Sequence, residues 1–397
     1  MKIAIVVQRY GDEVLGGSET EARQVAEHLK YYLQVEVLTT CSLDMLTWAN
    51  HYPPGLTLIN EVPVRRFLVQ TPRNLQRFAE AGINAFTPDV NYFNQIEWMR
   101  LQGPDSPELF NYINTHRDKY DLFLFMTYLY QSTFVGMQIV PEKSILIPTA
   151  HDEPPVYLSI FRNTFMLPRG IIFNTIDERN FVHRLFGNQH IPHAVLSVGI
   201  DIPDISTIRH RCQKLPHLQG DYLLYMGRVD TAKGCDQLFD YFLEYKNQTN
   251  DPVKLVLTGN KMMPIPSHPD ILALGFVSND ERLMWLNRAS LYVHPSSYES
   301  LSISTLEAWS FGLPVLVNGN TDVLRTHCEI SQGGFFYRSK IEFVEMLRYL
   351  RTHKALCQRM GQLGKSYVTE RYEWRKMTEG YITFLKSIYQ SINQSNP

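Results

Sequence analysis

Two glutamates near residue 300 are the strongest candidates for chemistry in this sequence. Glu299 and Glu307 have seven residues between them, in a segment that leads from an apolar run at 290–295 into a helical pattern. Ser302 and Ser304 are residue types that cap helices, so we expect a helix to begin near them with its free N–H groups open to an anion. The two carboxylates can then accept hydrogen bonds from hydroxyls of two sugars while the helix end binds phosphates. The alternative is that one glutamate caps its own helix and the other faces solvent.

A glycine-flanked loop with two cations is the second candidate. Gly227-Arg228-Val229-Asp230 is followed by Lys233-Gly234, between an apolar run at 222–226 and a helical pattern from 235. Arg228 can bind a diphosphate through its planar guanidinium, and Lys233 can bind it as a point charge, so that no metal ion is needed. The alternative is a pair of exposed loop cations.

Two further candidates stand in the first half of the chain. Gly16-Gly17 lies between the first apolar run and the first helical pattern, where an open α/β sheet offers backbone N–H groups to an anion, although most such pairs are ordinary turns. His151 follows the apolar run at 144–150. We expect Pro154 and Pro155 to stop the chain from entering a helix and to hold His151 at the rim of a site.

The elements that must position these residues alternate between short apolar runs and amphipathic helical stretches. This rhythm predicts an α/β fold with parallel, doubly wound sheets. It pauses near 200–220 and then restarts, so we predict two domains: residues 1–205, completed by a helix over 374–397, and residues 206–373. The runs read as strands lie at 2–7, 35–40, 121–127, 144–150, 170–175, 194–199, 222–227, 254–259, 271–276, 290–295 and 314–319.

Composition excludes several classes of protein. The 397 residues are 44% hydrophobic and 20% charged, so we expect a folded chain and not a disordered one. The net charge is −2, so we expect no nucleic-acid partner. Five scattered cysteines give neither a disulfide framework nor a zinc site, and no apolar run approaches the roughly 18 residues that span a bilayer. We therefore expect a cytoplasmic protein. A local basic cluster is read as a solvated face, with weak peripheral contact at the inner face of the membrane as the alternative; it comprises Arg65, Arg66, Arg73 and Arg77.

Taken together, these segments resemble the retaining nucleotide-sugar glycosyltransferases of the GT-B fold, glycosyltransferase family 4, over nearly the whole chain. The resemblance rests on Gly16-Gly17, His151-Asp152, Arg228, Lys233, the segment 275–299, the Glu299/Glu307 pair, and Tyr372 with Trp374 before the last helix. It implies two Rossmann-like domains facing across a cleft, the first for the acceptor and the second for the donor, with the C-terminal helix crossing back to the first domain.

The resemblance also implies a role for each matched residue. Glu299 and His151 would be catalytic and contact the transferred sugar, and Glu307 would hold the ribose hydroxyls. Gly16 and Gly17 would let the first loop approach the diphosphate. The remaining donor-binding positions would be Arg228, Lys233, Ser302 and Ile303 for the diphosphate, and Gly275, Phe276 and Val277 beside the base. The implied reaction transfers a hexose, from UDP-glucose by preference, to a glycan or lipid-linked acceptor with retention, and no metal or other cofactor is expected.

One departure from the family pattern keeps alternatives open. Ser300 and Ser302 stand where the family has the glycines of E-G-x-G. A GT-B epimerase or hydrolase would form product without an acceptor, and a degenerate binding protein would bind nucleotide without turnover. Tyr92, Phe93 and Trp98 could stack on an acceptor's sugar rings, although we expect aromatic residues at that spacing to lie in the core.

Overall fold

The computed structural model describes residues 1–14, 16–87, 91–202, 206 and 220–395. It divides into two compact units, Met1–Val198 with Arg375–Pro397, and Gly199–Trp374. The sequence placed the first division at 205/206 and the second at 373/374. Most of the connector expected at 200–220 lies outside the described residues.

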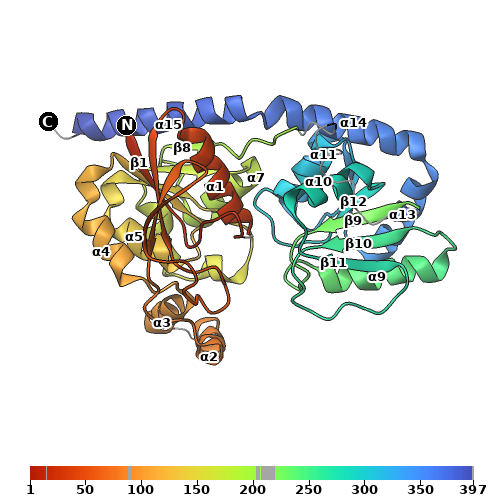
Figure 1. Cartoon of the computed structure of the whole chain (residues 1–397), viewed down its shortest axis with the longest axis horizontal. Helices are drawn as coiled ribbons and strands as arrows, with labels where there is room; N and C mark the ends of the chain where they lie inside the picture. The colour runs from red at the N-terminus through yellow and green to blue at the C-terminus, as the bar shows by residue number, and fades with distance from the viewer. Residues whose placement is uncertain (15, 88–90, 203–205, 207–219, 396–397) are drawn as a thin grey trace. The chain divides into compact units, whose positions relative to one another are not determined.

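Unit 1 is built on an eight-stranded sheet in the order β3-β4-β2-β1-β5-β6-β7-β8 (Figure 1). All neighbours are parallel except β3 and β4, which form an antiparallel pair at one edge. The central strands carry continuous apolar runs because helices cover both faces of a parallel sheet. The strands are β1 (Lys2–Val6), β2 (Gln34–Thr40), β3 (Gly55–Ile59), β4 (Val62–Phe67), β5 (Leu122–Met126), β6 (Ser144–Ile147), β7 (Gly170–Phe173) and β8 (His193–Val195).

In unit 1 strands and helices alternate as the sequence rhythm predicts, except between β2 and β5, where three successive strands are followed by three successive helices. The helices are α1 (Gly17–Leu29), α2 (Leu75–Ala85), α3 (Tyr92–Gln102), α4 (Pro107–Thr115), α5 (Gln131–Ile139), α6 (Phe161–Met166), α7 (Ile176–Phe186) and α15 (Trp374–Ser395), with short 3-10 turns at Arg117–Lys119, Pro141–Lys143 and Pro154–Tyr157. All of α15 after Trp374 belongs to unit 1.

Unit 2 is built on a six-stranded, wholly parallel sheet in the order β11-β10-β9-β12-β13-β14. Its strands are β9 (Tyr222–Met226), β10 (Lys254–Thr258), β11 (Ile271–Gly275), β12 (Leu291–His294), β13 (Val315–Asn318) and β14 (Gly334–Tyr337). Its helices are α9 (Cys235–Gln248), α10 (Asn279–Arg288), α11 (Ile303–Ser310), α12 (Asp322–Ser331), α13 (Lys340–Thr352) and α14 (Lys354–Arg371). The chain winds outward from β9 in one direction and from β12 in the other, so the strand order reverses between β9 and β12. Doubly wound folds bind ligands at such a reversal, outside the carboxyl ends of the strands. The predicted α/β, doubly wound architecture is confirmed.

The basic cluster is not a solvated face, and that prediction is wrong for three of its four members. Arg66 is 4% exposed and donates to the carbonyl of Tyr10, while Arg65 forms an ion pair with Glu36. The Arg73 guanidinium lies over the rings of Trp48 and Phe78. The side chain of the fourth member, Arg77, is 62% exposed. Three of the four charges are therefore paired or packed within unit 1.

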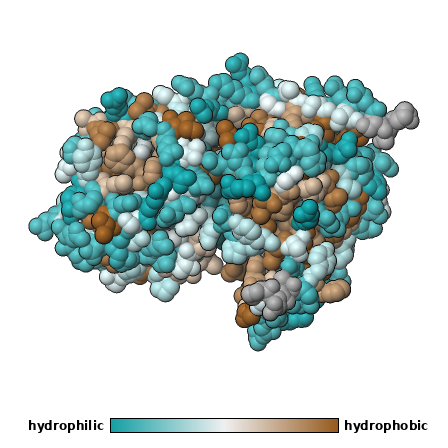
Figure 2. All heavy atoms as spheres, turned by 180° about the vertical axis from the view of Figure 1, so that it is seen from behind, coloured by the Kyte–Doolittle hydropathy of each residue, from teal (hydrophilic) through white to brown (hydrophobic). Residues whose placement is uncertain are grey.

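The aromatic residues of α3 divide between core and surface. Trp98 is 4% exposed and packs against Phe78 and Phe161, as expected for a core residue. Tyr92 and Phe93 are 51% and 79% exposed, against expectation. Figure 2 shows hydrophobic side chains interspersed with hydrophilic ones over the face opposite to that of Figure 1. None of the described helices combines the length and apolarity that crossing a bilayer requires.

Candidate sugar-nucleotide site

The second-unit candidates converge where the strand order of the sheet reverses. β9 and β12 are parallel neighbours, with Tyr292 opposite Leu224. Their carboxyl ends therefore meet at one edge of the sheet, and the loop after β9 (227–234) lies beside the loop after β12 (295–302). Gly234 shows how close this approach is, because an added Cβ would lie 2.5 Å from the carbonyl oxygen of Pro295. Its φ of +72° also favours glycine.

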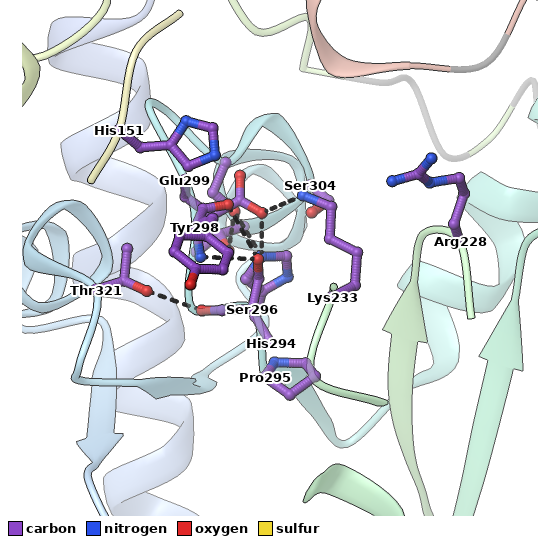
Figure 3. A network of polar contacts seen from close by, with 12 residues as sticks. His151, Arg228, Lys233, His294, Pro295, Ser296, Tyr298, Glu299, Ser304 and Thr321 are labelled. Carbon is purple, nitrogen blue, oxygen red and sulfur yellow. Dashed lines mark hydrogen bonds and ion pairs between the residues drawn. The ribbon is translucent and has the colours of Figure 1, made fainter. Parts of the chain in front are cut away.

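Lys233 and Glu299 form the central contact of this site. Lys233 Nζ donates to Glu299 Oε1 at 2.7 Å, and Nε2 of His294, the last residue of β12, lies 3.0 Å from the same oxygen (Figure 3). The side chains of Glu299 and His294 are 12% and 5% exposed. Two residues 66 positions apart in the sequence are thus joined by the fold.

The charge of Glu299 follows from these neighbours. Burial alone would raise the pKa of this carboxyl, but Lys233 and the hydrogen bond from His294 outweigh burial and hold the pKa well below its ordinary value. Glu299 is therefore an ionised carboxylate in a largely dry setting. Neither alternative considered for it, a helix cap or a solvent-facing side chain, describes its position.

Ser302 is the N-cap of α11, as expected, but it caps the helix in an unexpected way. Its backbone is left-handed, with φ +66°, and its side chain makes no capping hydrogen bond. Ser302 Oγ instead lies 2.8 Å from Thr305 Oγ1. The left-handed conformation is one that glycine adopts readily, so serine occupies a backbone shape suited to the glycine of the family pattern.

Glu307 lies inside α11, at the predicted place, and is held from a neighbouring helix. Arg282 of α10 forms an ion pair with Glu307 Oε2 through Nη1 and donates to Asn279 Oδ1 at 2.8 Å through Nη2. The Glu307 side chain is 19% exposed, so its carboxylate is held at the surface of the site rather than released into solvent.

Arg228 and the segment 275–277 complete the unit 2 candidates. Arg228 forms an ion pair with Asp230 at 3.2 Å, and the Lys233 backbone N–H donates to the same aspartate at 2.8 Å. Asp230 thereby shapes the loop that carries both cations. Gly275, at the end of β11, has φ +69°, and Phe276 after it is 61% exposed while Val277 is half-buried.

In unit 1, Gly16 and Gly17 stand at the start of α1, as expected. Gly16 is its N-cap with an extended backbone, and an added Cβ would lie 2.1 Å from Glu19 Oε2. Glu19 itself is bound by Arg9 at 2.6 Å, with both side chains 5% exposed. A buried ion pair therefore fixes the first turn of α1, a feature that sequence reasoning missed.

His151 lies after β6, in a loop held by two carboxylates. Its Nε2 is 3.6 Å from Glu153 Oε2, and Tyr128 donates to Glu153 Oε1 at 2.7 Å. Just before His151, the Ala150 N–H donates to Glu178 Oε1 at 2.6 Å. The expectation that the two prolines stop the chain from entering a helix is wrong, because Pro154–Tyr157 forms a 3-10 turn, which proline at its first positions favours.

Sequence reasoning missed the residues that support the loop after β12. His294 lies in the run 290–295 expected to be a strand and Arg282 in the segment 275–299, and type and spacing assign no role of its own to either residue or to Asn318. Asn318 Nδ2 donates to the Pro295 carbonyl at 3.0 Å, and Thr321 Oγ1 donates to the Ser296 carbonyl at 2.8 Å. The polar character of His294 and Asn318 at the ends of β12 and β13 could have indicated these two, whereas Arg282 lies within α10 and carries no such signal. Among the described residues, no group of three or more His, Cys, Asp or Glu side chains is placed to hold a metal ion.

Comparisons with known proteins agree with this geometry. Residues 220–350, all within unit 2, match the family model described as glycosyl transferases group 1. No protein of curated function matches the sequence.

Solved structures resemble the chain over almost its full length. The sucrose-phosphate synthase of Thermosynechococcus elongatus is 15% identical, with 98% of this chain and 99% of that chain covered and a TM-score of 0.73. HepE of Anabaena, in complex with UDP and glucose, is 16% identical, with 98% and 100% covered and a TM-score of 0.71. WaaG, a glycosyltransferase involved in lipopolysaccharide biosynthesis, is 14% identical, with 96% and 98% covered and a TM-score of 0.62. The chain has the GT-B fold, and its second unit carries a group 1 glycosyltransferase domain.

Proposed function

We propose that the protein is a retaining glycosyltransferase that moves a hexose from a nucleotide sugar, UDP-glucose by preference, to a glycan or lipid-linked acceptor. The observation that carries the proposal is the contact of Lys233 with the buried, ionised Glu299 where the strand order of the unit 2 sheet reverses. A cation for a diphosphate and a carboxylate for sugar hydroxyls lie side by side there. UDP-glucose is preferred because HepE, of the same fold, has been solved in complex with it.

Each group of this site meets a part of the donor. Lys233, Arg228 and the N-terminal amides of α9 and α11 would bind the diphosphate and stabilise the charge that grows on it as the bond to the sugar breaks. Glu299 would accept hydrogen bonds from hydroxyls of the transferred sugar, and Glu307 from the ribose. The roles of His151, Gly16 and Gly17 rest on the family resemblance alone.

The reaction breaks the bond between the sugar's anomeric carbon and the diphosphate oxygen and forms a bond from that carbon to the acceptor oxygen. The acceptor enters on the face that the leaving group departs, and a phosphate oxygen takes the acceptor's proton. Because cations and helix amides balance the leaving group's charge, we propose that no metal is needed, so a chelator should leave turnover unchanged.

The test begins with a thermal-shift panel of UDP-, GDP- and ADP-sugars and the free nucleotides. A ligand at 100 times its dissociation constant adds about 2.7 kcal/mol of stability. The stabilising donor is then incubated with glycan and lipid-linked acceptors, and the anomer formed is assigned by NMR. We expect transfer with retention. Product formed without acceptor would indicate a hydrolase or epimerase, and binding without any product would indicate a binding protein; either result contradicts the proposal.

A further inference from the structure

His294 is a buried side chain at the centre of the site to which the proposed reaction gives no role. It ends β12 and is 4% exposed. Its Nε2 lies 3.0 Å from Glu299 Oε1 and 3.4 Å from Ser302 Oγ, and its Nδ1 lies 3.2 Å from Tyr292 Oη. A polar ring in the core is thus in contact with polar atoms on both of its nitrogen sides.

The contacts fix the orientation of the ring. The Glu299 carboxylate can only accept a hydrogen bond, so His294 Nε2 carries a hydrogen and donates it. On the other side, Tyr292 Oη lies beside Nδ1 and donates its hydrogen to Ser304 Oγ at 2.8 Å. Since Tyr292 lies within β12 and Ser304 within α11, the imidazole is anchored to two rigid elements of unit 2.

Lys233 and His294 both contact the same oxygen of Glu299, but they hold it in different ways. Lys233 is a point charge on a flexible stem that extends from a loop, and its side chain is 31% exposed. A diphosphate bound at the same loop would attract the Lys233 ammonium and weaken its bond to Glu299. His294 is buried and anchored, so its bond to Glu299 would persist.

We propose that His294 is a positioning residue that keeps the Glu299 carboxylate oriented toward the transferred sugar while Lys233 turns to the diphosphate. Both donors contact Oε1, so the fixed carboxylate presents Oε2 to a sugar hydroxyl. This inference rests on the proposed function. Because this one buried imidazole holds Glu299, the carboxylate can bind the sugar whether Lys233 contacts Glu299 or the diphosphate.

Two amide substitutions separate this role from simple packing. The amide nitrogen of His294→Gln reaches the place of Nε2 and can still donate to Glu299. The shorter amide of His294→Asn reaches only the place of Nδ1 and leaves Glu299 without that donor. Both substitutions remove the ring. If His294 only fills space, the two variants should therefore lose kcat alike, or the smaller Asn should lower folding stability more than it lowers kcat.

The variants are compared by steady-state kinetics with UDP-glucose and by calorimetric binding of UDP and UDP-glucose. A hydrogen bond to a charged group corresponds to about a 10- to 100-fold effect, so we expect His294→Asn to lower kcat by that factor with donor KM changed less than about threefold. We expect His294→Gln to stay within about fivefold of the wild type. UDP lacks the transferred sugar, so its affinity should be the same in all three proteins, while the gain in affinity from UDP to UDP-glucose should shrink in His294→Asn alone.

Equal kinetics for the Gln and Asn variants, or a loss of UDP affinity in His294→Asn, would overturn the inference. Wild-type protein that turns over no nucleotide sugar would overturn the proposed function instead, so the two failures are distinguishable. If His294→Asn does not fold, Tyr292→Phe takes its place, because it removes the hydroxyl that orients Nδ1. It should lower kcat several-fold at unchanged UDP affinity, and a kcat equal to that of the wild type would overturn the inference.

Discussion

Lys233 contacts Glu299 in this structure and is also the cation best placed for a diphosphate. Its neighbour in the loop, Arg228, is bound to Asp230. If both cations stabilise the departing diphosphate, Arg228→Ala and Lys233→Ala should each lower kcat/KM by an amount equivalent to about 2 to 4 kcal/mol. Lys340→Ala is the matched control, since Lys340 forms an exposed ion pair with Asp240 in the same unit. Unchanged kcat/KM in both loop variants would contradict the diphosphate assignment.

The two glutamates should give different kinetic signatures. Glu307→Ala removes a partner of hydroxyls that are bound equally in ground and transition states, so it should mainly raise donor KM. Glu299→Ala removes a contact to the sugar that reacts, so it should mainly lower kcat. Glu345→Ala, which removes an exposed partner of Arg348, serves as the control. The division of roles fails if Glu299→Ala and Glu307→Ala change kcat and KM in the same proportions.

At the residue scale, the sequence predicts groups that stand out by type and spacing but not the side chains that hold them. Glu299 and Lys233 are charged residues in loops and Glu307 lies within α11, and the structure places Lys233 beside Glu299. His294 is one polar residue at the end of an apolar strand, and Arg282 is one of several charges on α10. Their partners lie 5 and 25 positions away, and such pairings depend on the packing of β12, α10 and α11.

At the element scale, a buried carboxyl on α1 predicts a pH effect in unit 1. Glu21 is 2% exposed, and Asn174 Nδ2 donates to its Oε2 at 3.0 Å. Two other buried side chains, Glu178 and Tyr381, interact electrostatically with Glu21. Burial raises the pKa of Glu21 from 4.5 to about 7, which the bond from Asn174 only partly opposes. The folded protein therefore binds more protons than the unfolded chain between these two values, and the free energy of unfolding should fall as pH rises across that window.

Glu21→Gln should remove this contribution. We expect the variant to gain about 3 kcal/mol over the wild type at pH 8 and little at pH 4.5, measured by denaturant unfolding across that range. Glu27→Gln on the same helix is the control, because Glu27 bonds to Asn60 at the surface. A constant difference between Glu21→Gln and the wild type at every pH would mean that Glu21 does not change protonation on folding in this window.

The elements that the sequence predicts and those that it misses differ in burial. Runs such as Leu122–Met126 and Tyr222–Met226 are fully buried on both faces and read directly as strands. β3 is exposed at all but its last position, so its pattern resembles a loop, and it is a strand only because it pairs with β4. β14 is a short strand that follows Gly333 and begins at Gly334. Edge strands depend on their neighbours, and a single sequence does not reveal those.

At the scale of the whole molecule, the chain passes from one unit to the other twice. The two passages lie at 198/199 and 374/375. On the unit 2 side they are in contact: the Ile200 N–H donates to the Tyr372 carbonyl at 2.7 Å, and a Cβ on Gly199 would lie 2.4 Å from the Trp374 ring. The sequence predicted the return of the last helix from its late arrival and its apolar spacing. The sequence places the first passage near 205/206, because its turn signals begin only after Gly199. Gly199 already packs against Trp374 of unit 2.

The return of α15 predicts that the C-terminal residues stabilise unit 1 and not unit 2. Tyr381, Leu385 and Ile388 are each at most 3% exposed, and a Cβ on Gly170 of β7 would lie 2.9 Å from Phe384, so this helix packs closely on the first sheet. Leu385→Ala should cost about 2 to 5 kcal/mol of the free energy of unfolding of unit 1. Leu347→Ala on α13, fully buried in the core of unit 2, is the matched control and should cost a similar amount there. Calorimetry with hydrogen exchange should therefore show Leu385→Ala losing protection in strands β1 to β8, far away in sequence, and Leu347→Ala losing it in β9 to β14. If either variant lowers protection equally in both sheets, the two units unfold as one cooperative body despite their separate cores.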